Sequence, residues 1–592
     1  MSSDHYDEEG RPAVEDERGE LSRRKLLQIG ALAGAAGALG GPAAGDELAP
    51  PAISAAAVEL EEATIAELGA AIAVGNLTSL QLVNMYLERI QTLDQSGPRV
   101  NSVLEINPDA RKIARARDQE RRRQGVRGPL HGIPILLKDN IDTHDAMQTT
   151  AGSLALEGTP PLQDSTVAAR LRAAGAIILG KANLSEWANF RGFQSTSGWS
   201  GRGLLTRNPY VLDRNPCGSS SGSSAAVSAN FCAAALGTET DGSIVCPSSI
   251  NGVVGIKPTV GLTSRAGVIP ISHTQDTVGP HGRTVADAAA VLGALVGVDP
   301  RDPATAASAG NFHTDYTQFL DPDGLRGMRI GIGREFFFGY SPETDAVGEA
   351  AIDAMRDAGA VIVDPADIPT INDLASDPAE IIVLIREFKS DLNAYLATRT
   401  GVPVQTLADC IEFNLDHAGR ELKFFGQEFF ELAEAEIFSQ AEYDDALVRG
   451  RQLSRTDGID KLMADQNLDA IFAPTGSPAW TTDLVNGDHF LGASSFPCAI
   501  AGYPIVQVPA GFAFGLPIGV SFMGRAWSEP TLIKIASGFE HVVQARRAPR
   551  FNFTIPPKAA PLVVQRSKAR AAERLAGLQG YLSGRRRLLH SL

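Results

Sequence analysis

The segment from Cys217 to Ser249 constrains the fold more than any other, because two loops of small residues enclose an apolar run. The first loop, residues 218–224, reads GSSSGSS, and the second, residues 237–243, reads GTETDGS. The run between them, residues 225–236, is rich in alanine and follows serines, so the sequence predicts a helix there, with room for a short strand. Two loops joined in this way can bring backbone N–H groups and hydroxyls to one point.

The Gly/Ser loop has three other interpretations. A flexible linker is disfavoured because apolar segments flank the loop closely, whereas linkers lie between domains. A structural turn without chemistry stays open. The third interpretation is a nucleophile elbow, because residues 218–222 match the pattern G-x-S-x-G with Ser220 at the centre. That elbow needs an apolar strand directly upstream, and residues 214–217, RNPC, make a poor strand.

The size and composition indicate a soluble globular protein rather than a nucleic-acid-binding module. The chain has 592 residues, of which 44% are hydrophobic and 21% are charged, and this length allows a large core. A formal net charge of −16 argues against nucleic acid as a main partner. Large α/β enzymes are often continuous, so the length does not require several domains. The sequence indicates no oligomeric state.

The N-terminus resembles an export signal. Residues 1–21 are polar, and Arg23 and Arg24 precede a weakly hydrophobic run, residues 29–39. Paired arginines before such a run are typical of a twin-arginine signal, and the run is too short to span a bilayer. We therefore expect residues 1–45 to be a disordered N-terminus plus this signal, and the protein to be exported to the periplasm or the medium. An amphipathic or buried helix and retention as an anchor are the alternatives.

The globular part is expected over residues 58–556. A tail, residues 557–592, is expected to be disordered because it is first Pro-rich and then basic. Within the globular part, strand-like and helix-like stretches alternate, which indicates α/β layers. Expected strands are residues 103–106, 132–140 and 176–179, and expected helices are residues 78–90, 109–124 and 165–174.

A long helical region is expected between residues 378 and 466. The periodic apolar positions predict helices over residues 380–396, 407–417 and 427–450. We expect these helices to cover the sheet, because most amphipathic helices of a large α/β protein do so. The alternative, in which this region lines a substrate pocket, stays open.

Cysteine, histidine and glycine patterns argue against a metal or nucleotide cofactor. The five cysteines are odd in number, lack a C-x-x-C pattern and are interpreted mostly as small core residues. The ten histidines show no H-E-x-x-H pattern, and His131, His273 and His281 are interpreted as structural turn residues. Residues 175–181 match the first part of a Walker A motif, but Ala182 replaces the hydroxyl residue that holds magnesium.

Lys138 lies near the end of the apolar run 132–140 and has two interpretations. A lysine at a strand end usually reaches for solvent. The functional interpretation is a buried, neutral lysine that serves as a base, because desolvation lowers the lysine pKa from about 10.4 by several units. Asp139 would oppose that lowering if its carboxylate pointed at the amine. The sequence leaves both interpretations open.

Several motifs taken together resemble the amidase signature family of hydrolases. They occur along residues 58–551, nearly the whole chain after the signal, so the match is far more specific than any motif alone. The motifs are GIPILLK ending at Lys138, the Gly/Ser loop 218–224, GTETDGS at 237–243, VGIKPT at 254–259, DTVGP at 276–280, APT at 473–475, AGYP at 501–504 and GLPIG at 515–519.

The resemblance implies a fold and a catalytic triad. The implied fold is a single large α/β domain with a mixed, twisted central sheet covered by helices on both faces. The implied triad is Ser-Ser-Lys, with Ser243 as nucleophile, Lys138 as base and Ser219 as the bridging serine, joined to Gly218 by a cis peptide bond. The chemistry also makes sense without the family, because a serine hydroxyl is a weak nucleophile and needs a base.

The implied mechanism passes protons between hydroxyls. Neutral Lys138 removes a proton from Ser219, which removes one from Ser243, and Ser243 attacks the amide carbonyl to form an acyl-enzyme. The negative oxygen needs hydrogen-bond donors that are already in place. The expected oxyanion hole consists of the N–H groups of Thr240, Asp241, Gly242 and Ser243.

Two positions depart from the commonest family pattern. Asp241 stands where many members have a glycine, and Val245 stands where many have an arginine that can bind a substrate carboxylate. A short anionic substrate is therefore less expected here. The sequence around these positions most resembles the peptide amidase branch, which removes C-terminal amide groups from peptides.

We therefore expect an exported amidase that acts on a small-molecule or peptide amide, with no cofactor, no metal, no nucleic acid partner and no stable membrane span. One alternative is a Ser-His-Asp carboxylesterase with Ser220 as nucleophile. Another is a non-catalytic exported binding protein with the same fold. An amidotransferase subunit that forms Gln-tRNA is disfavoured by the export signal and by the acidic composition.

Overall fold

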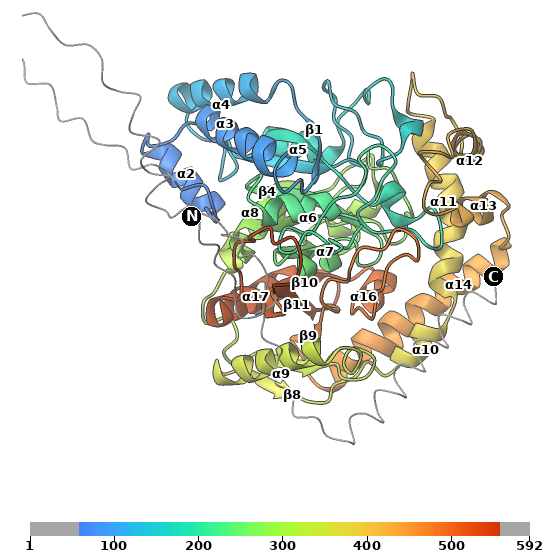
Figure 1. The fold of residues 1–592 in the computed structure, drawn as a ribbon. Coiled ribbons are helices and arrows are strands. Elements are labelled where there is room, and N and C mark those ends of the chain that lie inside the picture. The colour runs from blue at the N-terminus through green and yellow to red at the C-terminus, as the bar shows by residue number, and fades with distance from the viewer. Residues whose placement is uncertain (1–58, 557–592) are drawn as a thin grey trace, which may run out of the picture. The chain divides into compact units, whose positions relative to one another are not determined.

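A computed structural model describes residues 59–556, so the expected export signal (1–45) and the C-terminal tail (557–592) lie outside the described residues. This part is built on one eleven-stranded sheet with the order β1-β3-β2-β4-β6-β5-β10-β11-β9-β7-β8 (Figure 1). The strands are β1 (Val103–Ile106), β2 (Pro134–Lys138), β3 (Ile177–Ala182), β4 (Ala234–Glu239), β5 (Val254–Lys257), β6 (Thr277–Gly282), β7 (Arg329–Ile332), β8 (Val361–Val363), β9 (Ala470–Pro474), β10 (Ile505–Ala513) and β11 (Leu516–Met523).

The sheet is mixed and covered on both faces, as expected. β2 runs parallel to β3 and β4, β7 runs parallel to β8 and β9, and the other neighbours are antiparallel. Every residue of β2, β3, β4 and β6 is buried, so side chains on both faces are shielded from water. The covering helices are α4 (Ala110–Gln124), α5 (Thr166–Ala173), α6 (Ser221–Ser228), α7 (Val245–Ile250), α8 (Val285–Leu295), α9 (Pro342–Asp357) and α17 (Glu529–Val543).

The first described helices begin at sequence-encoded caps. α2 (Ile65–Ala73) and α3 (Ser79–Arg89) both start at capping boxes, in which a threonine and the residue three positions later satisfy each other's N–H groups. For α3 the pair is Thr78 and Gln81. Among residues 59–556, none of the helices combines the length and the apolar composition that a bilayer crossing requires.

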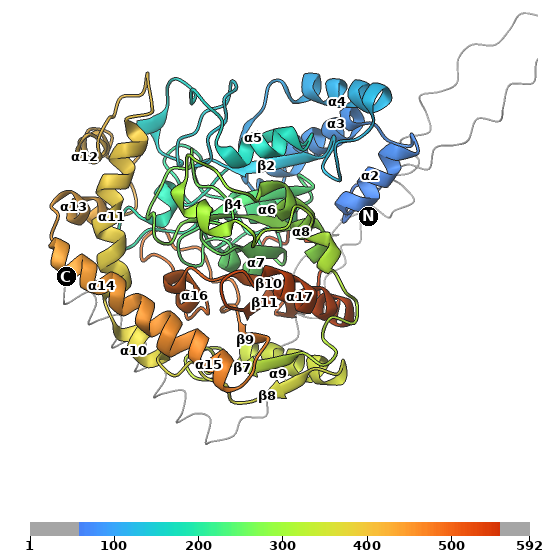
Figure 2. The same ribbon diagram turned by 180° about the vertical axis from the view of Figure 1, so that it is seen from behind.

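The helical region between β8 and β9 covers the sheet only in part, contrary to our expectation. Its helices are α10 (Ile371–Ser376), α11 (Ala379–Leu396), α12 (Leu407–Asp416), α13 (Glu428–Glu434) and α14 (Gln440–Arg451), followed by α15 (Asp460–Asp465) and, after β9, α16 (Phe496–Ala501). Ile371 of α10 and Leu462 of α15 share a core cluster with strand residues such as Ile471. The helices α11 to α13 instead lie to one side of the sheet in both views (Figures 1 and 2), and their apolar side chains pack against connecting segments that include Trp187 and Ile271. The region therefore borders the ends of strands.

Two predicted helices are divided in the structure. The expected helix over residues 427–450 is two helices, because Ser439 forms a capping box with Glu442 and starts α14. The expected helix over residues 225–236 is the end of α6 followed by the start of β4. Asn230 separates them with a left-handed backbone (φ 60°), so alanine-rich sequence continues from a helix into a strand.

One disulfide joins the residue before the Gly/Ser loop to the start of α7. Cys217 and Cys246 are bonded with their Cα atoms 6.1 Å apart. The prediction that most cysteines are core residues is correct for buried Cys232, Cys410 and Cys498 and wrong for this pair. Twenty-nine positions separate the two cysteines, so no short sequence motif indicates the bond. The bridge ties the Gly/Ser loop to α7.

Removing this bridge should lower the free energy of unfolding. The double variant Cys217→Ser/Cys246→Ser is expected to lose roughly 3–4 kcal/mol, because a bond across this separation restricts the unfolded chain. Urea unfolding with and without dithiothreitol measures the loss. Reductant should destabilise the wild type by a similar amount and leave the double variant unchanged. A wild type that is indifferent to reductant would contradict a structural role of the bond.

Candidate active site

Lys138 is the last residue of β2 and is buried. The neighbouring strand β4 runs parallel to β2 and carries Thr238 near its own end, and both strands are buried throughout. Lys138 Nζ lies 2.7 Å from Ser219 Oγ, 2.8 Å from Thr238 Oγ1 and 3.2 Å from the Thr238 carbonyl oxygen. The side chain is 0% exposed. The interpretation of Lys138 as a strand end that reaches for solvent is therefore wrong.

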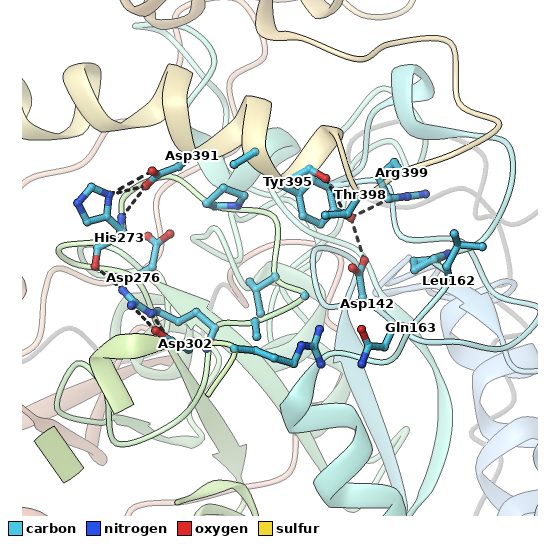
Figure 3. A pocket seen from close by; sticks show the side chains of 18 of the residues that line it. Asp142, Leu162, Gln163, His273, Asp276, Asp302, Asp391, Tyr395, Thr398 and Arg399 are labelled. Atoms are coloured by element: carbon cyan, nitrogen blue, oxygen red, sulfur yellow. Dashed lines mark hydrogen bonds and ion pairs between the residues drawn. The ribbon is translucent and has the colours of Figure 1, made fainter. Parts of the chain in front are cut away.

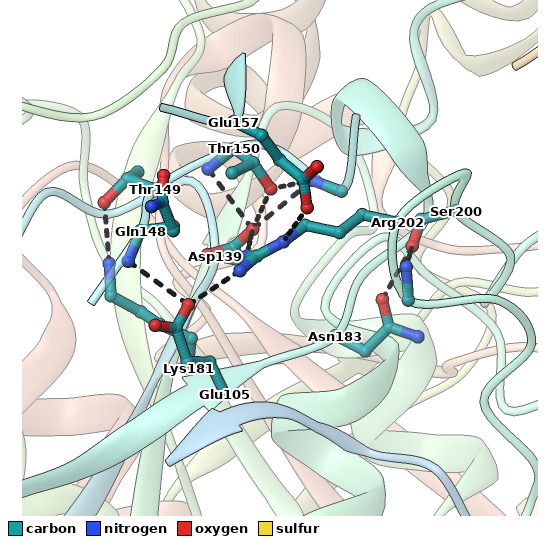
Figure 4. Close-up of polar contacts among 12 residues, drawn as sticks. Glu105, Asp139, Gln148, Thr149, Thr150, Glu157, Lys181, Asn183, Ser200 and Arg202 are labelled. Carbon is teal, nitrogen blue, oxygen red and sulfur yellow. Dashed lines mark hydrogen bonds and ion pairs between the residues drawn. The ribbon is translucent and has the colours of Figure 1, made fainter. Parts of the chain in front are cut away.

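Burial favours the neutral form of this lysine. It lowers the pKa of Lys138 from its usual value to about 7, although the nearby charges of Asp276 and Glu239 act in the opposite direction. Asp139 does not contribute, because its carboxylate accepts hydrogen bonds from the N–H and hydroxyl groups of Thr150 (Figure 4). The condition under which Asp139 would keep the amine charged is therefore not met.

A partly buried ionic network engages the carboxylate of Asp139. Arg202 Nη1 lies 3.6 Å from Asp139 Oδ2, and Arg202 also forms an ion pair with Glu105 at 2.8 Å (Figure 4). Lys181 on β3 donates to Thr149 Oγ1 at 2.7 Å in the same network. Two buried lysines on neighbouring strands thus have different surroundings, and only Lys138 contacts a serine hydroxyl.

The Gly/Ser loop is fixed by its own hydroxyls and backbone. Ser219 is fully buried, and the peptide bond between Gly218 and Ser219 is cis, as the family resemblance implied. The Ser219 carbonyl accepts a hydrogen bond of 3.0 Å from the Ser185 N–H, and Ser221 Oγ donates to the Cys217 carbonyl at 2.6 Å. These bonds hold the Ser219 hydroxyl against Lys138.

Ser243 lies in the second loop, which a buried carboxylate organises. Glu239 accepts hydrogen bonds from the N–H groups of Ile244 (2.7 Å) and Val245 (3.0 Å). Gly242 has φ 76°, a conformation that L side chains rarely adopt, and an added Cβ would lie 3.1 Å from Ser495 Oγ. The two loops meet where the Ser220 N–H donates to the Ser243 carbonyl at 3.1 Å.

The structure joins two members of the expected triad directly and the third through the backbone. Lys138 and Ser219 are in hydrogen-bond contact. Within residues 59–556, the hydroxyls of Ser219 and Ser243 form no hydrogen bond with each other, and the two loops touch instead through the Ser220–Ser243 backbone contact. Catalytic hydrogen bonds are often long in a protein without substrate, so the lack of this bond does not contradict the expected proton path.

The expected oxyanion residues form one loop, in which the N–H group of Gly242 is directed at the Glu239 carboxylate. In the described part of the chain, the N–H groups of Asp241 and Ser243 donate to no acceptor. Thr240 Oγ1 donates to Asp276 Oδ1 at 2.6 Å, and Asp276 Oδ2 accepts from two N–H groups of the segment 271–272. Asp276 and Glu239 therefore position the loop. Both residues lie inside motifs that indicated the family, but the sequence alone assigned no role to either.

Ser220 has no general base in the structure. Its side chain is fully buried, and its hydroxyl donates to the Thr238 carbonyl at 3.2 Å. Among the described residues, no histidine hydrogen-bonds to Ser220. His281, which lies on β6, pairs through Nδ1 with Ser248 Oγ at 2.8 Å, and burial lowers its pKa to about 3. This arrangement does not supply a Ser-His-Asp triad.

A cavity of about 440 Å³ lies beside α11 and the segment 265–276 (Figure 3). Two ion pairs line it: Arg265 with Asp302 at 2.7 Å, and His273 Nδ1 with Asp391 at 2.9 Å. His273 Nε2 faces a second carboxylate, Glu387, at 3.3 Å. Two carboxylates on opposite ring nitrogens suit an imidazolium rather than a metal ligand, and the hydrogen bond to Asp391 raises the pKa of His273.

Comparison with known proteins assigns the family. A family model described as Amidase matches residues 81–533. A probable amidase of Arabidopsis thaliana is 46% identical over 500 residues, covering 83% of this chain and 92% of the relative. A glutamyl-tRNA(Gln) amidotransferase subunit of Chloroflexus aurantiacus is 36% identical, covering 82% of this chain and 98% of the relative. The solved peptide amidase of Stenotrophomonas maltophilia is 50% identical, with a TM-score of 0.79 and coverage of 83% of this chain and 99% of that chain. The chain therefore belongs to the amidase family, and it is a hydrolase that acts on amide bonds.

Proposed function

We propose that this protein is an exported amidase that hydrolyses carboxamides through an acyl-enzyme on Ser243, with C-terminal peptide amides as its substrate class. The observation that carries the proposal is the buried amine of Lys138, 2.7 Å from Ser219 Oγ. In the described part of the chain, no carboxylate pairs with this amine. Similarity to a peptide amidase at 50% identity supports the substrate class.

The contacts of Lys138 suit a neutral base. A neutral amine has two N–H donors and one lone pair. Thr238 offers two acceptor oxygens to Nζ, its hydroxyl and its carbonyl, at 2.8 and 3.2 Å. With both N–H groups directed at Thr238, the lone pair of Nζ is left for the Ser219 hydroxyl. Ser219 then donates its proton to Lys138.

The remaining steps follow from the second loop. Ser219, having given its proton to Lys138, takes one from Ser243, whose oxygen attacks the amide carbonyl. The N–H groups of Asp241 and Ser243, free of other acceptors, stabilise the negative oxygen. One such donor contributes about 3 kcal/mol in comparable enzymes. The proton returns through Ser219 to the leaving amine, and water hydrolyses the acyl-enzyme.

Three serine variants test this assignment against the esterase alternative. Ser243→Ala should lower kcat by at least ~10³-fold, because no nucleophile remains. Ser219→Ala should also cause a large loss, because Lys138 no longer reaches Ser243. The matched control is Ser220→Ala, which removes a buried hydroxyl next in sequence and should retain most of the activity.

Ammonia release from C-terminal peptide amides measures these rates, and aryl amides, fatty amides and esters serve as comparison substrates. Peptide amides are expected to be hydrolysed with the highest kcat/KM. An active Ser243→Ala protein would overturn the triad. A Ser220→Ala protein that is inactive but folded would favour the esterase alternative, in which Ser220 is the nucleophile. Esters as the best substrates would contradict the amide class.

The pH profile should report the base. Since Lys138 acts in its neutral form and has a pKa of about 7, kcat/KM should rise with pH through neutrality and fall at acid pH. The charge of Asp276 raises the pKa of Lys138, so Asp276→Asn should move the acid limb to lower pH. Glu412→Gln, at an exposed acid on α12, is the control and should leave the limb in place. An acid limb that does not move in Asp276→Asn would contradict Lys138 as the titrating base.

Export is supported by the disulfide. Bonds such as Cys217–Cys246 form and persist mainly in oxidising compartments outside the cytoplasm. This agrees with the twin-arginine pattern at Arg23 and Arg24, which lies outside the described residues. Arg23→Lys/Arg24→Lys is expected to retain the protein in the cytoplasm, as measured by fractionation of expressing cells. Secretion of the double-lysine variant at the wild-type level would rule out this signal.

A further inference from the structure

Asp241 is an unusual residue in its loop. Between Ala234 and Ile250 every residue is buried except Asp241, which is exposed and lies two positions before Ser243. Its Oδ1 accepts a hydrogen bond from Ser495 Oγ at 2.5 Å, which fixes the direction of the carboxylate. Burial by the surrounding protein nevertheless raises the pKa of Asp241 to about 6. The carboxylate is thus accessible from solvent and largely enclosed by protein.

A second carboxylate lies close to Asp241. Glu380, in the first turn of α11, accepts a hydrogen bond of 2.9 Å from Gln275 Nε2, and the same nitrogen lies 3.4 Å from the Thr240 carbonyl. Gln275 therefore connects Glu380 to the oxyanion loop. Burial, and after it the charge of Asp241, raises the pKa of Glu380 to about 8. Because Thr240 directly precedes Asp241 in the chain, Gln275 places Glu380 in the neighbourhood of Asp241, and the two carboxyl groups form no hydrogen bond with each other.

No cation of the described chain neutralises this pair. Neither Asp241 nor Glu380 forms an ion pair with any lysine, arginine or histidine between residues 59 and 556. The buried amine of Lys257, whose charge acts on Asp241 from a distance, donates to the Tyr503 carbonyl at 2.6 Å. Two neighbouring acids without a paired cation disfavour each other's charged forms, and a positive charge bound beside them would relieve this.

We propose that Asp241 and Glu380 form a subsite for a positively charged group on the acyl part of the amide substrate. The proposal rests on the proposed function, because a primary amide loses only ammonia and all other recognition must fall on the acyl side. It also agrees with Val245, which leaves the loop without an arginine that could attract an anionic substrate. The cation is either the α-ammonium of an amino-acid amide or the side chain of a basic C-terminal residue.

Matched substrate pairs separate these two sources. Nα-benzoyl-arginine amide and Nα-benzoyl-citrulline amide differ in a side-chain charge at almost constant shape. Phenylalanine amide and Nα-acetyl-phenylalanine amide differ in the α-ammonium. We expect the charged member of at least one pair to have a kcat/KM about tenfold higher. Equal or lower values for the charged members of both pairs would overturn the subsite.

Variants connect the preference to the two carboxylates. Glu380→Gln should remove most of the preference for the charged substrate while lowering kcat/KM for the neutral one less. Asp241→Asn should act in the same direction, with a general loss as well because it adjoins the nucleophile. Glu412→Gln removes an exposed acid on the neighbouring helix α12 and should leave the ratio unchanged. A ratio that survives Glu380→Gln and Asp241→Asn would place the cation elsewhere and overturn the proposal.

The ratio of arginine amide to citrulline amide should also depend on pH. Arginine stays charged, so the ratio follows the carboxyl groups and should rise as they lose protons between about pH 5 and pH 9. Besides each other, Asp241 and Glu380 are surrounded by Ser495, Gln275 and the charges of Glu239 and Lys257. A ratio that is flat with pH would contradict titrating carboxylates in the subsite.

These outcomes are separable from failure of the proposed function. If neutral peptide amides are hydrolysed and Ser243→Ala is inactive, the catalytic assignment stands whatever the substrate charge does. Equal hydrolysis of charged and neutral amides then overturns the subsite alone. If no amide of either kind is hydrolysed by the folded wild type, both proposals fail.

Discussion

The hydrogen bonds around the buried amine of Lys138 are the interaction on which the active site depends. An amine inside a protein is costly unless its polar atoms are satisfied, and Thr238 and Ser219 satisfy them here at 2.8 and 2.7 Å. Burial lowers the pKa of the amine to about 7, so a neutral lone pair is available near neutral pH. Without the hydrogen bonds to Thr238, burying the amine would cost free energy that nothing else at this position offsets.

The sheet explains how these groups meet. β2 and β4 are parallel neighbours, so their carboxyl ends lie at the same edge and bring Lys138 beside Thr238. The two serine-bearing loops flank β4 along the chain, and the disulfide between Cys217 and Cys246 connects the start of the first loop to α7, which follows the second loop. The carboxylates of Glu239 and Asp276 accept hydrogen bonds from backbone and hydroxyl donors of the second loop and of the residues that follow it. They therefore position the loop and take no part in the reaction itself.

Much of this could be predicted from the sequence, and the limits have physical causes. The motifs, taken in order along the chain, indicated the family and through it the mixed sheet and the role of Lys138. This was possible because the turns and strands of the site require particular residues at neighbouring positions, which the sequence shows directly. The disulfide and Glu380 were missed, since each depends on a contact between positions far apart in the chain. The region around α11 was expected over the sheet, but amphipathic periodicity shows only that a helix has an apolar face, not what covers it.

The acidic surroundings of the site make sense for a base that must also return its proton. Burial alone would leave Lys138 so weakly basic that it could hardly take a proton from a serine hydroxyl. The charges of Asp276 and Glu239 oppose that effect and hold the pKa near neutrality. A group with this pKa can accept a proton during attack and donate it to the leaving amine, because neither form is strongly favoured. The two carboxylates therefore have a second effect besides fixing the loop: they keep the amine basic enough to take part in both half-reactions.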